Sequence, residues 1–465
     1  MLWVVRLRSV PMRRVSVRLP LAAAVVALLL FGWTPGADAP AATRRPHRAA
    51  RPARPVARTT TTTTTTTTLP PAAAPTTLAP PAPTISPQAY LDRVLAFMER
   101  NTARAGSVDV PAIVATARRR GADVTELAAT HPIIRDALAS LGDRHSALLD
   151  PKAAASFLRG QSTGFGFRVY PPDVIWLVPG SPAEAAGIRN LDRLQTLNGK
   201  AFAQTTAADR MAPVAAIAVT RDGQPLQFTV TRGALVTAER PSVRALGDRL
   251  GYVDLPGATG DRQAETAFAR TGLDGIRGVE EAIRPCGWVV DLRRNSGGFP
   301  FSMLSVLEPF LGSGPFLGFA YGGGDRDDVA FADGILRVGT STVWSTPDPV
   351  RLGAPDVPVA LLTSPTTASA GEAAVISFIG RPHSATFGEA TTGVTSANVG
   401  INLPDGAFVM VTHSYDLDRG GKLYDGPLVP DVALATDWTV FATATDPVLN
   451  AARAWLDAQP ACISR

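Results

Sequence analysis

The hydrophobic pattern divides the first third of the chain into segments of different character. An apolar run at residues 19–31 follows an arginine-containing stretch, and residues 40–87 consist mainly of Ala, Pro, Arg and Thr. Beyond them, apolar positions recur at helical spacing over residues 90–98 and again over residues 133–141. We therefore expect a small helical N-terminal domain over residues 88–158.

The rest of the chain changes from strand-rich to alternating character. Residues 159–237 combine short apolar runs with glycine and proline turns, which predicts a β domain. Apolar runs that predict strands then alternate with stretches that predict helices. The predicted strands are residues 250–255, 287–292 and 357–362, and the predicted helices are residues 264–284, 301–311 and 369–379. Such alternation predicts an α/β domain. We place it at residues 238–445, followed by a C-terminal helix and tail at residues 446–465.

Residues 1–39 have the features of an export signal. Arginines precede the apolar run, which is shorter than the ~20 residues that span a bilayer, and Ala37 and Ala39 form an A-x-A pattern. The segment is either cleaved or kept as an anchor, the only membrane contact that we expect. Residues 40–87 bury too little apolar surface to fold, which predicts a disordered spacer. We expect a secreted or envelope-associated protein.

Charge and cysteine content exclude two classes of function. The chain of 465 residues has a formal net charge of +5, but much of this excess comes from arginines before residue 60. No basic stripe follows, so we expect no nucleic-acid partner. Cys286 and Cys462 have no CxxC neighbour and no histidine at ligand spacing, which argues against a zinc site. They form either one disulfide or two free thiols.

The β domain carries motifs that resemble a PDZ domain of the bacterial protease-associated kind. They are GFGF at residues 164–167, PGSPAEAAG at residues 179–187 and LNG at residues 197–199. Glycines allow backbone N–H groups to face a peptide's terminal carboxylate, and the phenylalanines would line a pocket for its last side chain. A β-barrel with glycine turns is the alternative. The expected peptide-binding residues are Gly164, Phe165, Gly166 and Phe167.

Three motifs of the α/β domain indicate chemistry. DLRRNSGG at residues 291–298 follows an apolar strand, and its glycines allow backbone N–H groups to face a ligand. TSPTTASAGE at residues 363–372 places Ser369 at a helix N-terminus, where unpaired N–H groups and the helix dipole favour a developing negative charge. A simple helix cap is the alternative for this serine. The third motif is FGEATTG at residues 387–393.

In this order the motifs resemble the tail-specific, or C-terminal processing, serine peptidases of family S41. The resemblance covers roughly residues 88–440 and implies an α/β fold: a crotonase-like β-β-α core, a helical N-terminal domain and an inserted PDZ-like domain. It further implies protein or peptide substrates, no metal and no cofactor. Ser369 would be the nucleophile. The oxyanion hole would use the N–H groups of Ala370 and of Gly297 or Gly298.

The chain departs from the best-known members of that family at the general base. Their lysine stands twenty-five positions after the serine, and here that position is Val394. Because a serine hydroxyl is a poor nucleophile by itself, another base is required. The tricorn-like branch uses a histidine from the helical part, and His145 in GDRHS matches it, although lysine-type members carry a structural histidine there. His383 and His413 are the remaining candidates.

A third residue should orient the base. Glu372, one helical turn after Ser369, is the first candidate, and Asp425, Asp143 and Ser146 are alternatives. Together these features predict an exported serine endopeptidase that works through an acyl-enzyme and engages substrate C-termini. The alternatives are a catalytically silent family member that binds peptide or an apolar ligand, and a PDZ scaffold at the cell surface.

Overall fold

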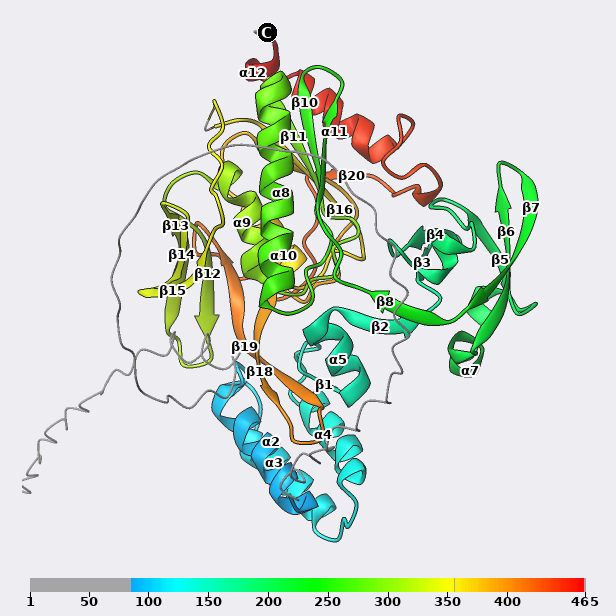
Figure 1. The fold of residues 1–465 in the computed structure, drawn as a ribbon. Helices are drawn as coiled ribbons and strands as arrows, with labels where there is room; N and C mark the ends of the chain where they lie inside the picture. The colour runs from blue at the N-terminus through cyan, green and yellow to red at the C-terminus, as the bar shows by residue number, and fades with distance from the viewer. Residues whose placement is uncertain (1–84, 355, 464–465) are drawn as a thin grey trace, which may run out of the picture. The chain divides into compact units, whose positions relative to one another are not determined.

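The computed structural model describes residues 85–354 and 356–463, shown as a coloured ribbon in Figure 1. The predicted signal segment and nearly all of the predicted spacer lie outside the described residues. Within the described part of the chain, no helix is long and apolar enough to cross a membrane.

The α/β domain is built on a six-stranded sheet in the order β20-β17-β16-β11-β10-β9. The pair β9–β10 is antiparallel and the other neighbours are parallel. All five residues of β10, of β11 and of β16 are buried, which is why continuous apolar runs predict these three strands. The strands are β9 (Ser242–Leu246), β10 (Leu250–Asp254), β11 (Gly287–Asp291), β16 (Val359–Thr363), β17 (Ser384–Gly388) and β20 (Val432–Ala433).

Helices cover both faces of this sheet. Residues of α8, α9 and α10 share one hydrophobic core with one face, whereas α11 packs against the opposite face. The predicted helices at residues 264–284 and 301–311 are confirmed to within two residues, and α10 ends three residues earlier than predicted. The helices are α8 (Arg262–Ile283), α9 (Pro300–Leu311), α10 (Ala370–Ile376), α11 (Pro447–Asp457) and the short α12 (Pro460–Ile463).

A second, antiparallel sheet of seven strands lies on the other side of α8, α9 and α10. Figure 1 shows β12 to β15 on one side of these helices and β10, β11 and β16 on the other. The sequence pattern does not predict this sheet. Its strands are β1 (Ala147–Leu149), β12 (Pro315–Tyr321), β13 (Arg326–Ala332), β14 (Ile335–Val338), β15 (Ser341–Ser345), β18 (Ser396–Asn402) and β19 (Phe408–Asp418).

The predicted N-terminal helices are present, but they do not form a separate unit. They share a hydrophobic core with the hairpin β18–β19, including Val399, Val409 and Val411. Strand β1 also pairs with β19. The helical region therefore holds the turn at residues 142–146 against the hairpin. Its helices are α2 (Pro87–Asn101), α3 (Val110–Gly121), η1 (Leu127–Ala129), α4 (Thr130–Ala139) and α5 (Pro151–Arg159).

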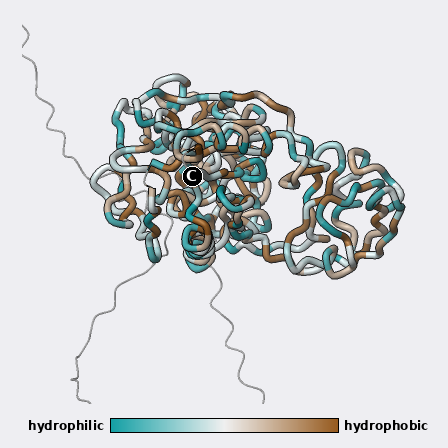
Figure 2. The backbone as a smooth tube through the Cα atoms, turned by 90° about the horizontal axis from the view of Figure 1, so that it is seen from above, coloured by the Kyte–Doolittle hydropathy of each residue, from teal (hydrophilic) through white to brown (hydrophobic). Residues whose placement is uncertain are grey.

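Residues 161–236 form a β domain with its own hydrophobic core. Its five-stranded antiparallel sheet has the order β3-β4-β5-β6-β7, and the paired strands β2 and β8 lead into and out of it. Figure 2 shows brown, hydrophobic stretches within this domain, on the right of the view. The elements are β2 (Gln161–Gly164), β3 (Phe167–Tyr170), β4 (Val174–Leu177), α6 (Pro182–Ala185), β5 (Arg193–Leu197), η2 (Phe202–Gln204), α7 (Ala207–Met211), β6 (Val214–Arg221), β7 (Gln224–Thr231) and β8 (Gly233–Val236).

Cys286 and Cys462 form a disulfide, with their Cα atoms 5.0 Å apart. Of the two possibilities that the sequence leaves open, the structure has the disulfide. The bond ties α12 to the residue that precedes β11. Both cysteines are buried, so the C-terminal segment is anchored in the core formed by α11 and the parallel sheet.

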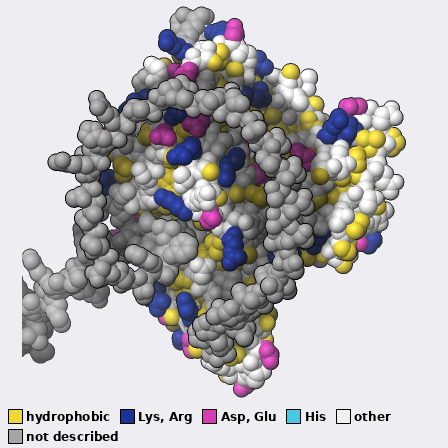
Figure 3. All heavy atoms as spheres, in the orientation of Figure 1, with side chains coloured by type: hydrophobic (Ala, Val, Ile, Leu, Met, Phe, Trp, Pro, Cys, Tyr) yellow, Lys and Arg dark blue, Asp and Glu magenta, His cyan; other side chains and the backbone are white. Residues whose placement is uncertain are grey.

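The surface carries charges of both signs. On the face seen in Figure 3, Lys and Arg side chains are interspersed with Asp and Glu side chains. Exposed ion pairs of the surface include Arg351 with Asp333, whose side chains are 86% and 94% exposed. Pairs as exposed as this one contribute ~1 kcal/mol or less to stability.

Candidate active site

The motif residues meet at the carboxyl end of the parallel sheet. Strands β10, β11 and β16 are parallel, so the loops that follow them emerge at the same edge. The loop after β11 carries Gly297 and Gly298, and the loop after β16 leads to Ser369. A Cβ atom placed on Gly297 would lie 2.8 Å from Ser369 Cβ. The structure therefore brings the predicted nucleophile and the predicted glycine turn into contact.

Ser369 lies at a strained corner between strand and helix. Its φ and ψ angles are 51° and −121°, which an L-residue rarely adopts. It directly precedes α10, so its half-buried side chain lies at the positive end of the helix dipole. Backbone strain of this kind persists where the surrounding structure enforces it, often at functional sites. The corner presents the serine hydroxyl at the edge of the sheet where the glycine turn also lies.

The Glu372 carboxylate enforces this corner. It accepts hydrogen bonds from the N–H groups of Ser369 (3.0 Å), Gly393 (2.7 Å) and Val394 (2.8 Å), and from the Thr391 hydroxyl. Burial raises the pKa of Glu372, and these hydrogen bonds oppose the rise. Among the described residues, no hydrogen bond joins Glu372 to His145. Glu372 therefore holds the backbone of the predicted nucleophile, Ser369, whereas the sequence pattern predicts that it orients the base.

The predicted oxyanion donors differ in availability. The N–H of Gly297 donates to Asn295 Oδ1 at 2.9 Å, so it is already satisfied. The N–H groups of Gly298 and Ala370 donate no hydrogen bond to any residue that the structure describes. Gly298 has a φ angle of 118°, and a Cβ atom there would lie 1.9 Å from the Ala258 oxygen, so this position requires glycine. Of the two predicted glycines, Gly298 is the one with a free donor.

His145 lies in the turn between α4 and β1. Its Nδ1 atom is 2.8 Å from Ser396 Oγ, and Asn398 Nδ2 donates to its backbone oxygen at 3.3 Å. Burial lowers the pKa of His145 to about 4, against the opposing effect of the Asp143 carboxylate. The ring is therefore neutral at pH 7 and able to accept a proton. Within the described residues no hydrogen bond joins His145 to Ser369, and such bonds are often long or absent without substrate.

The turn that carries His145 is linked to Ser369 through residues 391–394. Arg144 Nη2 donates to the Gly393 oxygen at 3.0 Å, and the Gly393 N–H donates to Glu372, which also holds Ser369. Of two partners in this region, Thr391 stands in the FGEATTG motif, whereas Ser396 belongs to none of the motifs. Their roles depend on pairing between segments far apart in the chain.

The other predicted candidates lie elsewhere or contact other groups. His413 Nδ1 is 2.9 Å from the Asn101 oxygen, and His383 lies exposed in the loop before β17. Asp143 accepts from the backbone N–H groups of His145 and Ser146, and Asp425 is exposed. In the part of the chain that the structure describes, no hydrogen bond joins any of these side chains to Ser369 or to the ring of His145.

A buried carboxyl group that the motifs do not include lies close to Glu372. Asp416 on β19 is 1% exposed, and neither of its carboxyl oxygens has a hydrogen-bond partner among the described residues. Burial, with a contribution from the Glu372 charge, raises the pKa of Asp416 to about 8. Asp416 therefore carries a proton at neutral pH. This arrangement keeps a second negative charge away from the carboxylate that holds Ser369.

The raised pKa of Asp416 predicts a pH-dependent stability. The native state keeps this proton up to about pH 8, whereas an unfolded chain releases it near pH 4, so stability falls as pH rises between these values. Between pH 5 and pH 8.5 the parent protein should lose free energy of unfolding. We expect this loss to be a few kcal/mol smaller in Asp416→Asn than in the parent, because the amide cannot ionise. Urea denaturation at both pH values measures the difference. Equal losses in the two proteins would contradict the assignment.

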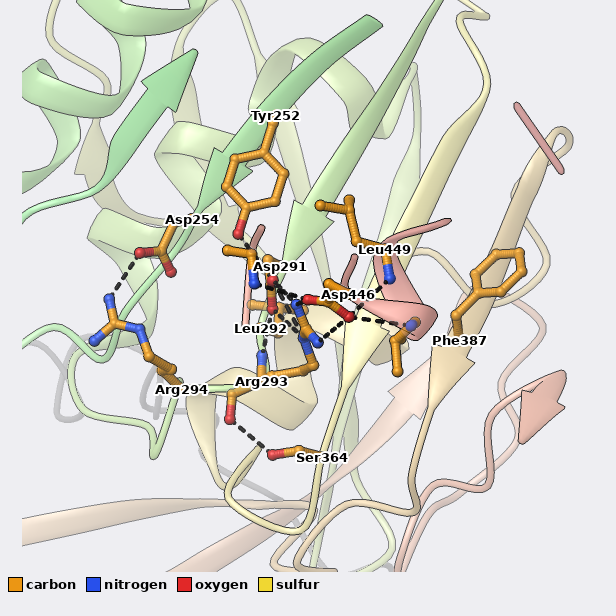
Figure 4. A network of polar contacts seen from close by, with 12 residues as sticks. Tyr252, Asp254, Asp291, Leu292, Arg293, Arg294, Ser364, Phe387, Asp446 and Leu449 are labelled. Atoms are coloured by element: carbon orange, nitrogen blue, oxygen red, sulfur yellow. Dashed lines mark hydrogen bonds and ion pairs between the residues drawn. The ribbon is translucent and has the colours of Figure 1, made fainter. Parts of the chain in front are cut away.

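A buried ion network supports the loop after β11. The Arg293 side chain is 0% exposed and pairs with Asp291 (2.6 Å) and with Asp446 (2.7 Å), as Figure 4 shows. Ser364 Oγ donates to the Arg293 oxygen at 2.7 Å, which links this loop to the one before Ser369. The network therefore fixes the two loops of the site relative to each other and to the N-terminus of α11.

The GFGF motif of the β domain is partly used for packing. Phe165 is 6% exposed and belongs to the core of the domain, and its part in a peptide pocket stays a prediction. Gly164 pairs with Gly233, and Phe167, half-buried, begins β3. A Cβ atom on Gly166 would lie 2.1 Å from Ser181 Cβ, which explains the glycine there by close packing.

The β domain contacts the loop that carries the glycine turn. The Arg294 guanidinium lies 4.2 Å from the ring of Trp176 and pairs with Asp254 at 2.7 Å and with Glu239 at 3.1 Å. Arg168 of β3 pairs with the same Glu239 at 3.1 Å. Arg294 stands four positions before Gly298, so the β domain touches the segment that carries this predicted oxyanion donor.

No group of three or more His, Cys, Asp and Glu side chains that could hold a metal ion occurs within residues 85–354 and 356–463. The site offers a serine at a helix N-terminus, two backbone N–H groups without a partner among the described residues, and a neutral histidine whose turn is linked to Ser369 through Gly393 and Glu372. Such a set can perform nucleophilic acyl transfer, in which the serine attacks a carbonyl and the donors hold the resulting oxyanion.

Comparisons with known proteins agree with this chemistry. Residues 249–434, which include Ser369 but not His145, match the model of peptidase family S41. The nisin-resistance protein of Lactococcus lactis subsp. lactis is 25% identical over 299 residues, covering 58% of this chain and 86% of that protein. The chloroplastic carboxyl-terminal-processing peptidase 2 of Arabidopsis thaliana is 26% identical over 333 residues, covering 64% of this chain and 60% of that protein. A lipoprotein structure from Streptococcus agalactiae, 17% identical with a TM-score of 0.53, covers 82% of this chain and 98% of its own, which shows a similar fold.

Proposed function

The chain belongs to peptidase family S41 and is a serine-type peptidase, and on this premise we propose that it is an exported endopeptidase with Ser369 as nucleophile and His145 as general base. The position of Ser369 carries the proposal: a strained corner at the positive end of α10, in contact with the glycine turn. The substrates are proteins or peptides, and no cofactor takes part.

The proposed reaction is acyl transfer. His145 takes the proton of the Ser369 hydroxyl while Oγ bonds to the peptide carbonyl carbon, and the N–H groups of Ala370 and Gly298 bind the oxyanion. The C–N bond then breaks, and His145 returns the proton to the leaving amine. A water molecule, deprotonated in the same way, hydrolyses the acyl-enzyme and restores the serine. The neutral state of His145 at pH 7 supports this role.

Export is supported by two features. The N-terminal sequence has the order of a secretory signal, and the disulfide between Cys286 and Cys462 is typical of proteins that fold in oxidising compartments. We therefore propose that the peptidase acts outside the cytoplasm, secreted or attached to the cell envelope. The Thr- and Pro-rich residues 40–87 would then separate it from the envelope.

We further propose that the β domain is PDZ-like and engages the C-terminus of the substrate. The GFGF, PGSPAEAAG and LNG motifs support this assignment, and the contact between Trp176 and Arg294 gives the domain a physical route to the glycine turn. A peptide that binds the domain would then present its chain to Ser369, or change the position of the loop that carries Gly298.

Removal of residues 164–233 tests the role of the β domain. Thr163 and Ala234 are paired across β2 and β8, so an Asn-Gly turn can join them and close the shortened hairpin. The intact enzyme should have an approximately tenfold lower KM for a peptide with a free C-terminus than for its amide, worth ~1.4 kcal/mol. The shortened enzyme should lose this preference. An equal preference in both proteins would contradict C-terminal engagement by the domain.

A further inference from the structure

The ring of His145 has one hydrogen-bond partner among the described residues, the hydroxyl of Ser396. The Nδ1–Oγ distance is 2.8 Å, and Ser396 is 7% exposed, so water competes little for the contact. Ser396 is the first residue of β18 and lies 251 positions after the histidine. The contact is therefore a product of the fold, made where the hairpin meets the helical region.

None of the nearby carboxylates takes this place. Glu372 is occupied by three backbone N–H groups and by Thr391. Asp143 binds the backbone N–H of His145 and both the N–H and the hydroxyl of Ser146, and it makes no hydrogen bond to the imidazole ring within the described chain. The position beside Nδ1 that an aspartate occupies in a Ser-His-Asp triad is here taken by a neutral hydroxyl.

Strand β18 and the residues before it hold both halves of the site. Ser396 contacts the ring of His145, and Asn398 holds the backbone oxygen of the same residue. Val394, two positions before Ser396, donates to the carboxylate of Glu372 that also holds Ser369. The segment 394–398 therefore spans the distance between nucleophile and base, and Ser396 is its contact with the imidazole.

We propose that Ser396 is the positioning residue for His145: its Oγ accepts a hydrogen bond from Nδ1–H and so holds the tautomer in which Nε2 is free to take the proton of Ser369. This inference rests on the proposed function. A hydroxyl can serve in this way because its oxygen accepts from Nδ1–H whether the ring is neutral or protonated. As a neutral group it orients the imidazole without supplying a compensating negative charge.

Ser396→Ala, Ser396→Thr and the control Ser414→Ala test this role. Ser414 is also buried, on the neighbouring strand, and makes no side-chain hydrogen bond with a described residue. Loss of one positioning hydrogen bond should lower kcat about tenfold in Ser396→Ala with KM unchanged. Ser396→Thr retains a hydroxyl and should recover most of the activity. Ser414→Ala should behave as the parent. Parental kcat in Ser396→Ala would overturn the proposal.

Histidine-selective ¹⁵N NMR provides a readout that does not depend on turnover. In the parent protein the His145 signals should show Nδ1 protonated and Nε2 unprotonated, and Ser396→Ala should shift them towards a mixture of tautomers. The spectrum remains informative even if the parent protein cleaves no peptide, an outcome that would count against the proposed function alone. Identical His145 signals in the parent and in Ser396→Ala would overturn the positioning role, whatever the activity.

Discussion

Ser369→Ala is expected to lower kcat at least a thousandfold, because without Oγ no acyl-enzyme can form. Loss of a catalytic serine in a peptidase costs roughly 10³-fold to 10⁶-fold in kcat, since binding and the oxyanion donors provide only the residual rate. The fold should be unaffected. The substitution leaves the backbone bond from Ser369 N–H to Glu372 in place, and that bond, rather than the hydroxyl, holds the corner.

The control for Ser369→Ala is the same substitution at a serine outside the site. Ser313 is exposed in the turn between α9 and β12, so Ser313→Ala is a matched control that should keep the parental kcat. Initial rates on an unfolded protein substrate such as casein, measured for the parent and both variants, give the ratio. Urea denaturation of the same samples should give equal midpoints. If Ser369→Ala retained more than a tenth of the parental rate, another nucleophile would have to be sought.

Asp446→Ala should lower the free energy of unfolding by about 3–5 kcal/mol, because it removes one partner of a buried ion pair. The Asp446 carboxylate binds Arg293 and accepts from the N–H groups of Ala442, Val448 and Leu449, so its loss also uncaps α11. Arg293 keeps Asp291, but its fully buried guanidinium would be only partly compensated. We expect this to be among the largest losses of stability from a single side chain.

The matched control for Asp446 is Asp333→Ala, which also removes an ion pair. The Asp333 side chain is 94% exposed, so we expect its loss to cost ~1 kcal/mol or less. Urea denaturation followed by tryptophan fluorescence compares the two variants. A loss in Asp446→Ala no larger than in Asp333→Ala would show that the network of Figure 4 does not support the fold.

The sequence predicts the elements whose signal is local. Strands β10, β11 and β16 are continuous apolar runs because both of their faces are covered, and α8 shows its buried stripe at helical spacing. The antiparallel sheet is not predicted from the sequence. Strands such as β13 mix buried and exposed positions irregularly, and their pairing with β12 and β14 is set by tertiary contacts rather than by a local pattern.

In the site, too, residues with a local sequence signal are predicted and residues placed by tertiary contacts are not. Ser369 and the glycine turn stand in motifs at strand ends, so their proximity follows from the parallel order of β11 and β16. The role of Glu372 is different from the one predicted, because its spacing from Ser369 says nothing about residues 391–394, which take up its carboxylate. Ser396 and Asp416 could not be identified from the sequence, since neither has a local signal.

Covalent labelling of Ser369 by a fluorophosphonate tests the central claim most directly, because the reagent reacts with serines activated as nucleophiles and needs no knowledge of the substrate. Peptide mass mapping of the labelled protein should find the adduct on Ser369 in the parent and little or none in His145→Ala. An unlabelled parent protein, an adduct on a different serine, or equal labelling of Ser369 in His145→Ala would contradict the account of a serine nucleophile activated by His145.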